Sequence, residues 1–223
     1  MELFIGTSGW SYDWNVGKSL TWYIENSNSN AMELNMSFYR FPFPNMVKSW
    51  ADKGRNLAWV IKVHRSITHF KKLKKESIEI FKKFTDIFKQ LEEHIHYYLL
   101  QLPPSFTDID ILDKFIDEVN CDKICVEFRN KSLFNDDIIF WGKKKGILIV
   151  SVDAPGLPRK IMSKDIIYER IHGRNEWYAY NYNNEELLEI KNNLIKNNPK
   201  NLYIFFNNHF MYKNVKEMSN LLL

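Results

Sequence analysis

Acidic, basic and imidazole side chains recur at the same end of several hydrophobic segments of this chain. Glu33, Glu127 and His172 are the three that we expect to be catalytic. Two carboxylates and an imidazole can exchange protons near neutral pH when burial and neighbouring charges separate their pKa values. The sequence therefore predicts acid–base chemistry, and it leaves open which carboxylate is the acid and which the base.

Arginines lie at or just beyond the ends of the same segments. Arg40, Arg129, Arg170 and Arg174 are our candidate ligand-binding residues, with Arg65 nearby. A guanidinium binds phosphate or carboxylate through two parallel hydrogen bonds. The simplest prediction is a small anionic molecule as ligand. For Arg65 and Arg174, which fall in predicted loops, solvent exposure is an alternative interpretation.

Further polar and aromatic side chains complete the predicted binding site. They are Ser8, Trp10, Tyr12, Asn35, Tyr39, Lys62, Gln101, Asp153, Tyr178, Asn207 and Asn208. The aromatic rings could stack on a sugar or a base. They could instead cap the protein core, which is the interpretation we favour for Trp10.

The same charged residues have a purely structural interpretation. Buried charges need partners, so the carboxylates could pair with the basic side chains as a polar plug without function. The groups concerned are Glu33, Glu127 and Asp153 on one side and Lys62, Arg129 and Arg170 on the other. We favour a site because so many strand ends contribute.

No cofactor is predicted and no metal ligand is assigned. His64, Glu127, Asp153 and His172 could converge on a divalent metal, but these four residues form no H-x-H or H-E-x-x-H spacing. The same segment ends carry cationic side chains, which oppose a metal ion. A divalent metal is therefore the less favoured alternative.

Eight short segments rich in Ile, Val, Phe, Tyr and Leu must position these residues. We predict strands at residues 2–8, 31–37, 57–63, 97–102, 123–129, 147–153, 166–172 and 202–207. Most intervals are long enough for a crossover helix. The pattern predicts a single α/β domain over residues 1–223, a (β/α)8 TIM-type barrel whose mouth lies at the carboxyl ends of the strands.

Helix signals fill most intervals between the predicted strands. Apolar residues from Ile80 to Ile95 recur on one helical face. Thr107 with Asp110, and Asn183 with Glu186, have the spacing of helix caps. Residues 154–165 contain two prolines and a glycine, so the crossover between strands six and seven should lack a regular helix. A doubly wound open sheet is the alternative, disfavoured because no G-x-G-x-x-G turn follows the first strand.

Composition bounds the class of protein. The 223 residues are 45% hydrophobic and 15% aromatic, with a formal net charge of +4. This suits one large globular domain, and the mild positive charge permits nucleic-acid binding without requiring it. No signal peptide or membrane span is evident, so we expect a cytoplasmic protein with no membrane partner, in which Cys121 and Cys125 are reduced thiols.

A set of short motifs resembles a known family. In order they are Gly6-Thr7-Ser8-Gly9-Trp10-Ser11-Tyr12, Glu33-Leu34-Asn35, Ser37-Phe38-Tyr39-Arg40, Arg65-Ser66-Ile67-Thr68-His69, Gln101-Leu102-Pro103-Pro104, Val126-Glu127-Phe128-Arg129, Asp153-Ala154-Pro155-Gly156, Arg170-Ile171-His172-Gly173-Arg174 and Phe205-Phe206-Asn207-Asn208. The pattern resembles the YecE-like family, domain of unknown function 72. The resemblance implies a barrel distantly similar to endonuclease IV and xylose isomerase, and it implies no reaction. Asn15-Val16-Gly17 and His209 depart from the family pattern.

The functional prediction follows from the mixed charges at the mouth. We expect an enzyme, of hydrolase, lyase or isomerase type, that binds a small phosphate- or carboxylate-bearing substrate with arginine clamps and Glu/His acid–base residues. The alternative is a nucleic-acid-binding or processing protein, and a binding module without catalysis is a third interpretation. The oligomeric state is not predicted.

Overall fold

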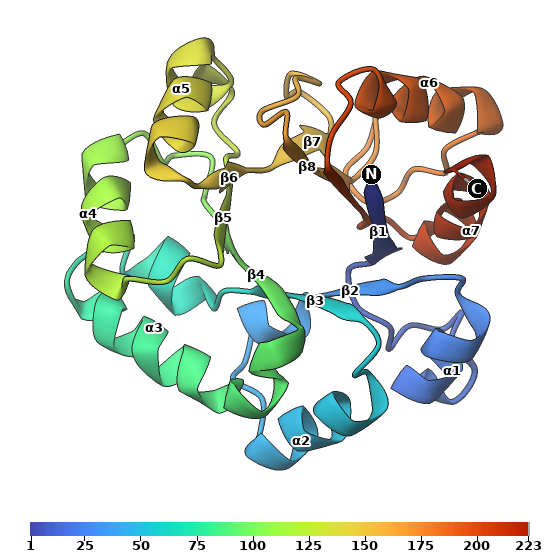
Figure 1. Ribbon diagram of the computed structural model, residues 1–223, viewed down its shortest axis with the longest axis horizontal. Helices are drawn as coiled ribbons and strands as arrows, with labels where there is room; N and C mark the ends of the chain where they lie inside the picture. The colour runs from blue at the N-terminus through green and yellow to red at the C-terminus, as the bar shows by residue number, and fades with distance from the viewer. Residues whose placement is uncertain (223) are drawn as a thin grey trace.

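The computed structural model describes residues 1–222, which form one nine-stranded parallel sheet curled into a nearly closed barrel. Figure 1 shows a ring of strands with helices around its outside. The strands are β1 (Glu2–Thr7), β2 (Ala31–Leu34), β3 (Ala58–Lys62), β4 (Ile95–Gln101), β5 (Ile124–Glu127), β6 (Leu148–Ile149), β7 (Ser151–Asp153), β8 (Ile166–Ile171) and β9 (Asn201–Phe206). Their order round the sheet is β6-β5-β4-β3-β2-β1-β9-β8-β7. The predicted TIM-type α/β barrel is confirmed.

Helices follow most strands and cover the outer face of the sheet. They are α1 (Leu20–Asn26), α2 (Pro44–Lys53), α3 (Glu76–Ile87), α4 (Ile109–Val119), α5 (Asp136–Lys145), α6 (Asn184–Ile195) and α7 (Met211–Leu222). Shorter helical turns lie at Val16–Lys18, Met36–Phe38, Ser66–Phe70, Lys89–His94 and Lys131–Leu133. No helix within residues 1–222 combines the length and hydropathy that crossing a membrane requires.

The ring closes through a single interrupted strand. The predicted sixth strand is divided at Val150 into β6, which pairs with β5, and β7, which pairs with β8. The Val150 amide still donates to the Val126 carbonyl at 2.8 Å. As predicted, no helix lies between β7 and β8, and only loop covers this part of the ring in Figure 1.

Three local expectations about the secondary structure need correction. The second strand ends at Leu34 rather than at residue 37, because Met36–Phe38 turns into a short 3-10 helix. Ile95 begins β4 instead of ending a helix. Asp108, not Thr107, caps α4 by accepting a hydrogen bond from the Ile111 amide. The capping box of Asn183 and Glu186 at the start of α6 is confirmed.

Candidate functional site

The register of the sheet determines which side chains enter the barrel. In a parallel sheet, paired residues point to the same face. Arg170 pairs with Phe205, Glu127 with Gln101 and Glu33 with Val60, and all of these residues face the inside of the ring. Lys62 lies two residues beyond Val60 on β3 and so faces the same way. Glu33, Lys62, Glu127 and Arg170 therefore converge inside the ring near the carboxyl ends of their strands.

Strand six is the exception to the expected alternation. Val152 pairs with Arg170, and Asp153 pairs with Ile171. Val152 therefore shares the inward face, while Asp153 points outward, toward the layer between the sheet and the helices. The expectation that Asp153 lines the mouth with the other strand ends does not match the structure, because this strand turns apolar residues inward.

Glu33 is fully buried and has a hydrogen bond on every side. Arg170 donates from Nε to Oε2 at 2.8 Å and from Nη2 to Oε1 at 2.6 Å. The Ser8 hydroxyl donates to Oε1, and the Tyr168 hydroxyl donates to Oε2 at 2.5 Å. Burial alone would raise the pKa of Glu33, but Arg170 and these hydroxyls outweigh it, so the pKa lies below its ordinary value. The carboxylate is held ionised.

Glu127 is the second buried carboxylate of this network. It accepts from Arg170 Nη1 on one oxygen and from Arg129 Nε on the other. Burial raises its pKa, but Arg129 and Arg170, with a contribution from Lys62, lower it below the ordinary value overall. Arg170, itself fully buried, thus bridges the two glutamates. The structure brings together the ion pairs of the structural interpretation, and these pairs leave both carboxylates as poor proton donors.

His172 lies beside this network and is neutral. Its Nε2 lies 3.1 Å from Arg129 Nη2, and since a guanidinium only donates, Nε2 must be the acceptor and Nδ1 carries the hydrogen. Burial, followed by Arg129, Arg170 and Lys62, lowers the pKa of His172 well below its ordinary value. Its Nδ1 has no hydrogen-bond partner among the described residues.

A loop after β8 covers Arg129 and His172. The Trp177 ring centre lies 4.5 Å from the Arg129 guanidinium carbon, and Tyr178 meets the His172 ring edge-on at 5.7 Å. The loop begins at Gly173, whose φ of 133° suits glycine and where a Cβ would meet the Glu176 carbonyl oxygen at 2.2 Å. This turn seals the network from solvent on that side.

Lys62 is a buried cation of the mouth that has no acidic partner among residues 1–222. Its side chain is inward at the end of β3, the residue is 4% exposed, and Nζ lies 4.3 Å over the Phe38 ring. Within residues 1–222 it forms no ion pair, since Arg170 and Arg129 occupy Glu33 and Glu127. Burial, followed by repulsion from Arg170, lowers the pKa of Lys62 to about 7.

Two adjoining cavities open at the mouth. A cavity of about 240 Å³ is lined by Lys62 together with Tyr12, Asn35, Tyr39, Tyr178, Asn207, Asn208, His209 and Met211. A second, of about 590 Å³, shares Tyr12, Asn35 and Tyr39 and adds Ser8, Trp10 and Arg40. The structure therefore brings ten of the predicted binding residues to one accessible surface: Ser8, Trp10, Tyr12, Asn35, Tyr39, Arg40, Lys62, Tyr178, Asn207 and Asn208.

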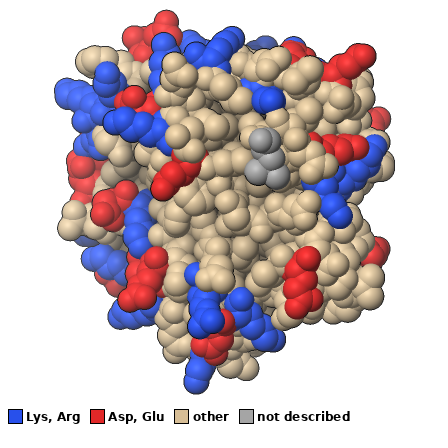
Figure 2. All heavy atoms as spheres, turned by 45° about the vertical axis from the view of Figure 1, so that its right-hand side comes forward, with Lys and Arg blue, Asp and Glu red and all other residues tan. Residues whose placement is uncertain are grey.

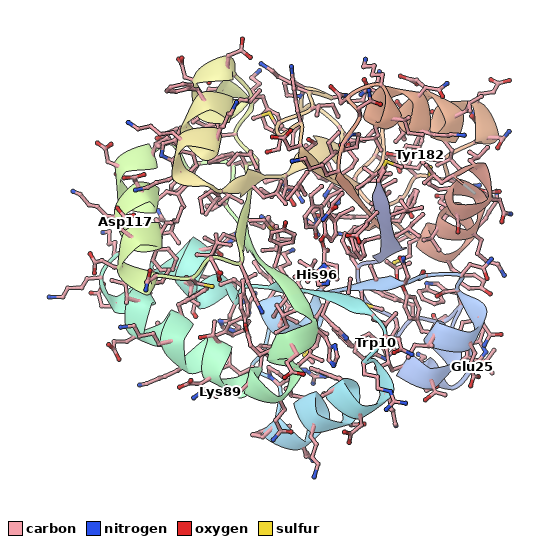
Figure 3. All side chains as sticks on the ribbon, in the orientation of Figure 1. Trp10, Glu25, Lys89, His96, Asp117 and Tyr182 are labelled. Carbon is pink, nitrogen blue, oxygen red and sulfur yellow. The ribbon has the colours of Figure 1, made fainter. Side chains whose placement is uncertain are left out.

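Other predicted residues lie elsewhere. Arg174 contacts Asp153 at 3.4 Å and Glu189 at 2.8 Å, and with them lines a separate cavity of about 510 Å³ beside α6. Tyr182, which donates to Asp153 at 3.0 Å, lies on the α6 side of the ring in Figure 3, whereas Trp10 lies toward α1 and α2. Asp153 and Arg174 are therefore not part of the mouth.

Three predicted positions make contacts with the protein itself, and two of them, Trp10 and Asn208, also line the mouth cavities. Gln101, at the end of β4, donates weakly to the Leu102 carbonyl at 3.4 Å and lines neither mouth cavity. Trp10 packs edge-on against Trp50 and Trp59, as the capping interpretation expects. The Asn208 amide donates to the Tyr180 carbonyl and to Asn214.

Sequence reasoning missed Tyr168 and Glu169 on β8. Tyr168 has the same parity as Arg170 and supplies a hydrogen bond to Glu33, so a strict period-two count would have included it. Glu169 points outward and lines the cavity beside α6, where burial, followed by Asp153, raises its pKa well above the ordinary value. Its acidic type within an apolar strand was the available signal.

The proposed convergence of metal ligands is not found. Of the four candidates, Asp153 faces outward, His64 bonds Ser66 at 2.7 Å, and Glu127 and His172 lie against Arg129. In the part of the chain that the structure describes, no group of three or more His, Cys, Asp or Glu side chains is placed to share a metal ion.

The fold and the mouth define a class of protein, a parallel α/β barrel with a buried ion network beneath a polar opening. The family model described as "Protein of unknown function DUF72" matches residues 4–222, and the chain belongs to this family. The predicted resemblance is confirmed. A search of curated proteins found no significant match.

Solved structures extend the comparison. A DUF72 family protein from Thermotoga maritima is 26% identical, with a TM-score of 0.85 over 100% of this chain and 99% of that one. A DUF72 family protein from Enterococcus faecalis is 21% identical, with a TM-score of 0.86 over 99% and 95%. SacUVDE is 10% identical with a TM-score of 0.65, covering 100% of this chain and 98% of its own. The likeness to SacUVDE is one of fold.

Proposed function

We propose that this chain is an enzyme that binds a small phosphate- or carboxylate-bearing molecule at the barrel mouth. The observation that carries the proposal is the buried, unpaired ammonium of Lys62 at the edge of an accessible cavity. Beneath it, two carboxylates already face two guanidiniums, so the network is balanced without Lys62. An anion in the cavity would supply the partner that a buried cation needs.

Two amide groups indicate what else the ligand carries. The Oδ1 atoms of Asn35 and Asn208 are buried without a hydrogen-bond partner among residues 1–222, and both residues line the cavity with Lys62. A buried acceptor without a donor costs about 1–3 kcal/mol. A ligand that bears hydroxyl groups beside its anionic group would supply these donors.

Glu33, Glu127 and His172 enter this proposal as supporting groups. All three are buried, and none lines either mouth cavity. The two glutamates act on the protonation of Lys62 through their charge, together with Arg170 and Arg129. Lys62 is therefore the ionisable group of the network that we expect to meet the ligand.

The test is thermal unfolding of the protein with inorganic phosphate, glycerol 3-phosphate and lactate. We expect at least one of these anions to raise the Tm of the wild type and to have no effect on Lys62→Met. Lys48→Met removes an exposed lysine on α2 and should respond like the wild type. Equal stabilisation of wild type and Lys62→Met would refute the proposal, because surface charge would then explain the binding.

A nucleic-acid-binding protein is the second candidate, and an exposed cluster supports it. The Arg65 guanidinium lies 5.6 Å from the Tyr39 ring and 5.4 Å from the Phe70 ring, and these residues are 57% and 66% exposed. Aromatic rings with arginine can stack on unpaired bases. On the face in Figure 2, however, basic and acidic side chains are interspersed rather than gathered into a positive stripe.

A short single-stranded DNA distinguishes this candidate from the first. Binding that weakens steeply with salt and is lost in a Tyr39→Ala, Phe70→Ala double variant would favour nucleic acid. DNA binding unaffected by the double variant would count against the cluster as its site.

A further inference from the structure

We infer that Lys62 is a covalent catalyst that forms a protonated imine with a small keto acid or keto phosphate. The inference rests on the proposed function and deepens it, because it adds a reaction class to the anion site. Amines that attack carbonyl groups must be accessible, free of a fixed ion pair and surrounded by apolar or cationic groups.

The geometry of Lys62 meets each of these requirements. Its Nζ lies over an apolar ring, that of Phe38, and its charge is not paired with any carboxylate of residues 1–222. It borders an open cavity of about 240 Å³, and Tyr12, Asn35 and Tyr39 line both this cavity and the larger one beside it. A molecule of a few carbon atoms can therefore reach the nitrogen from the mouth.

The surroundings also favour the neutral amine. Burial and nearby cations lower the pKa of Lys62 to about 7, so the neutral amine is far more populated near pH 7 than it is for an ordinary lysine. Two glutamates oppose this shift without cancelling it. The charged and titratable groups that act on Lys62, or on which it acts, are Arg170 on β8, Glu127 on β5, Glu33 on β2, Arg129 after β5, His172 after β8 and His69 after β3.

The step balances without a cofactor. The neutral nitrogen attacks the carbonyl carbon, forming a C–N bond while the C=O π electrons move to oxygen, and one proton passes from nitrogen to that oxygen. The hydroxyl then takes a further proton and leaves as water, and the C=N bond forms. The positive charge stays on nitrogen, next to the anionic group of the substrate.

Tyr12 is placed to supply the proton that the departing hydroxyl needs. It lines both mouth cavities, and its hydroxyl now donates to the Ser8 carbonyl at 3.0 Å. Burial, followed by the charge of Glu33, raises the pKa of Tyr12, so its hydroxyl stays protonated near neutral pH. The same contact with Ser8 ties this donor to the network around Glu33.

Borohydride trapping tests the inference. The wild type is incubated at pH 7 with pyruvate or dihydroxyacetone phosphate, reduced with sodium borohydride, and weighed by intact-protein mass spectrometry with peptide mapping. We expect one reduced adduct per chain, located on Lys62, with at least one of the probes. Lys48→Met should gain the same adduct, and Lys62→Met should gain none at this site.

Lys62→Arg separates this inference from the proposed function, because it keeps the cation and cannot form an imine. We expect glycerol 3-phosphate or lactate to stabilise Lys62→Arg while the adduct is lost. Stabilisation of the wild type by these anions, without a Lys62 adduct from either probe, would overturn the inference and leave the proposed function standing. Absence of both anion stabilisation and adduct would overturn both.

Discussion

Arg170 donates hydrogen bonds to both carboxylate oxygens of Glu33, with Nε 2.8 Å from Oε2 and Nη2 2.6 Å from Oε1. Its remaining nitrogen donates to Glu127, so one fully buried guanidinium bridges two buried carboxylates. The bidentate fork requires the planar geometry of arginine, which lysine cannot reproduce.

Removing this guanidinium should destabilise the fold. Arg170→Met leaves two buried carboxylates short of a partner, and we expect a loss of about 3–5 kcal/mol in the free energy of unfolding, measured with urea. Lys89→Met is the control, because the Lys89–Asp86 pair is exposed on both sides and worth about 0–1 kcal/mol. A loss of less than about 1 kcal/mol for Arg170→Met would show that the network does not stabilise the barrel.

Acid should weaken the same network. The pKa values of Glu33 and Glu127 are lowered in the folded state, so their contribution to stability is present above the unfolded value of about 4.5 and is lost as pH falls through the folded values. Urea unfolding between pH 7 and pH 3 measures this loss. Glu127→Gln should be less stable at pH 7 and should lose less on acidification. An equally steep loss in that variant would contradict the assignment.

Glu169 should affect the pH dependence of stability in the opposite direction. Its pKa is raised in the folded state, so the free energy of unfolding falls as pH rises from the unfolded value of about 4.5 through the folded value. Glu169→Gln should therefore raise the free energy of unfolding by about 1 kcal/mol or more at pH 8 and by little at pH 4. Glu185→Gln, an exposed change at the start of α6, should alter neither value. A gain that is the same at both pH values would argue against titration of Glu169.

Lys62 should make stability rise with pH. Because its pKa falls from 10.5 in the unfolded chain to about 7 in the folded one, the unfolded state binds the extra proton between these values. We expect Lys62→Met to be more stable than the wild type at pH 7, with the difference closing as pH approaches 10.5. Chemical denaturation at pH 7, 8.5 and 10 gives the comparison. Lower stability of the variant at pH 7 would refute it.

Strand periodicity predicted much of the site. Glu33, Lys62, Glu127 and Arg170 have the parity that the structure confirms as inward, because hydrophobic alternation fixed the register of these strands. Asp153 was misplaced because the sixth predicted strand is apolar from Ile147 to Val150 and polar only at Ser151 and Asp153, so the sequence pattern alone did not show which parity faces inward. The pairing with β8 decides it.

Which of the inward charges would be free could not be read from the sequence. Arg170 and Lys62 are both basic residues near strand ends, yet Arg170 reaches two glutamates and Lys62 reaches none. That difference depends on side-chain geometry across four strands of the ring, β2, β3, β5 and β8, and only the three-dimensional arrangement supplies it.

The interruption at Val150 leaves the sheet with short strand pairings on both sides of this residue. β6 pairs with β5 at two positions and β7 pairs with β8 at three, whereas β8 and β9 pair at six. With no crossover helix over this stretch, thermal fluctuation should open the barrel here more readily than between β8 and β9. Asp153 lies on the outer side of β7, and Val152 lies beside Arg170 on the inner side. Opening of the barrel at this strand would therefore let water reach the buried charges from below the mouth.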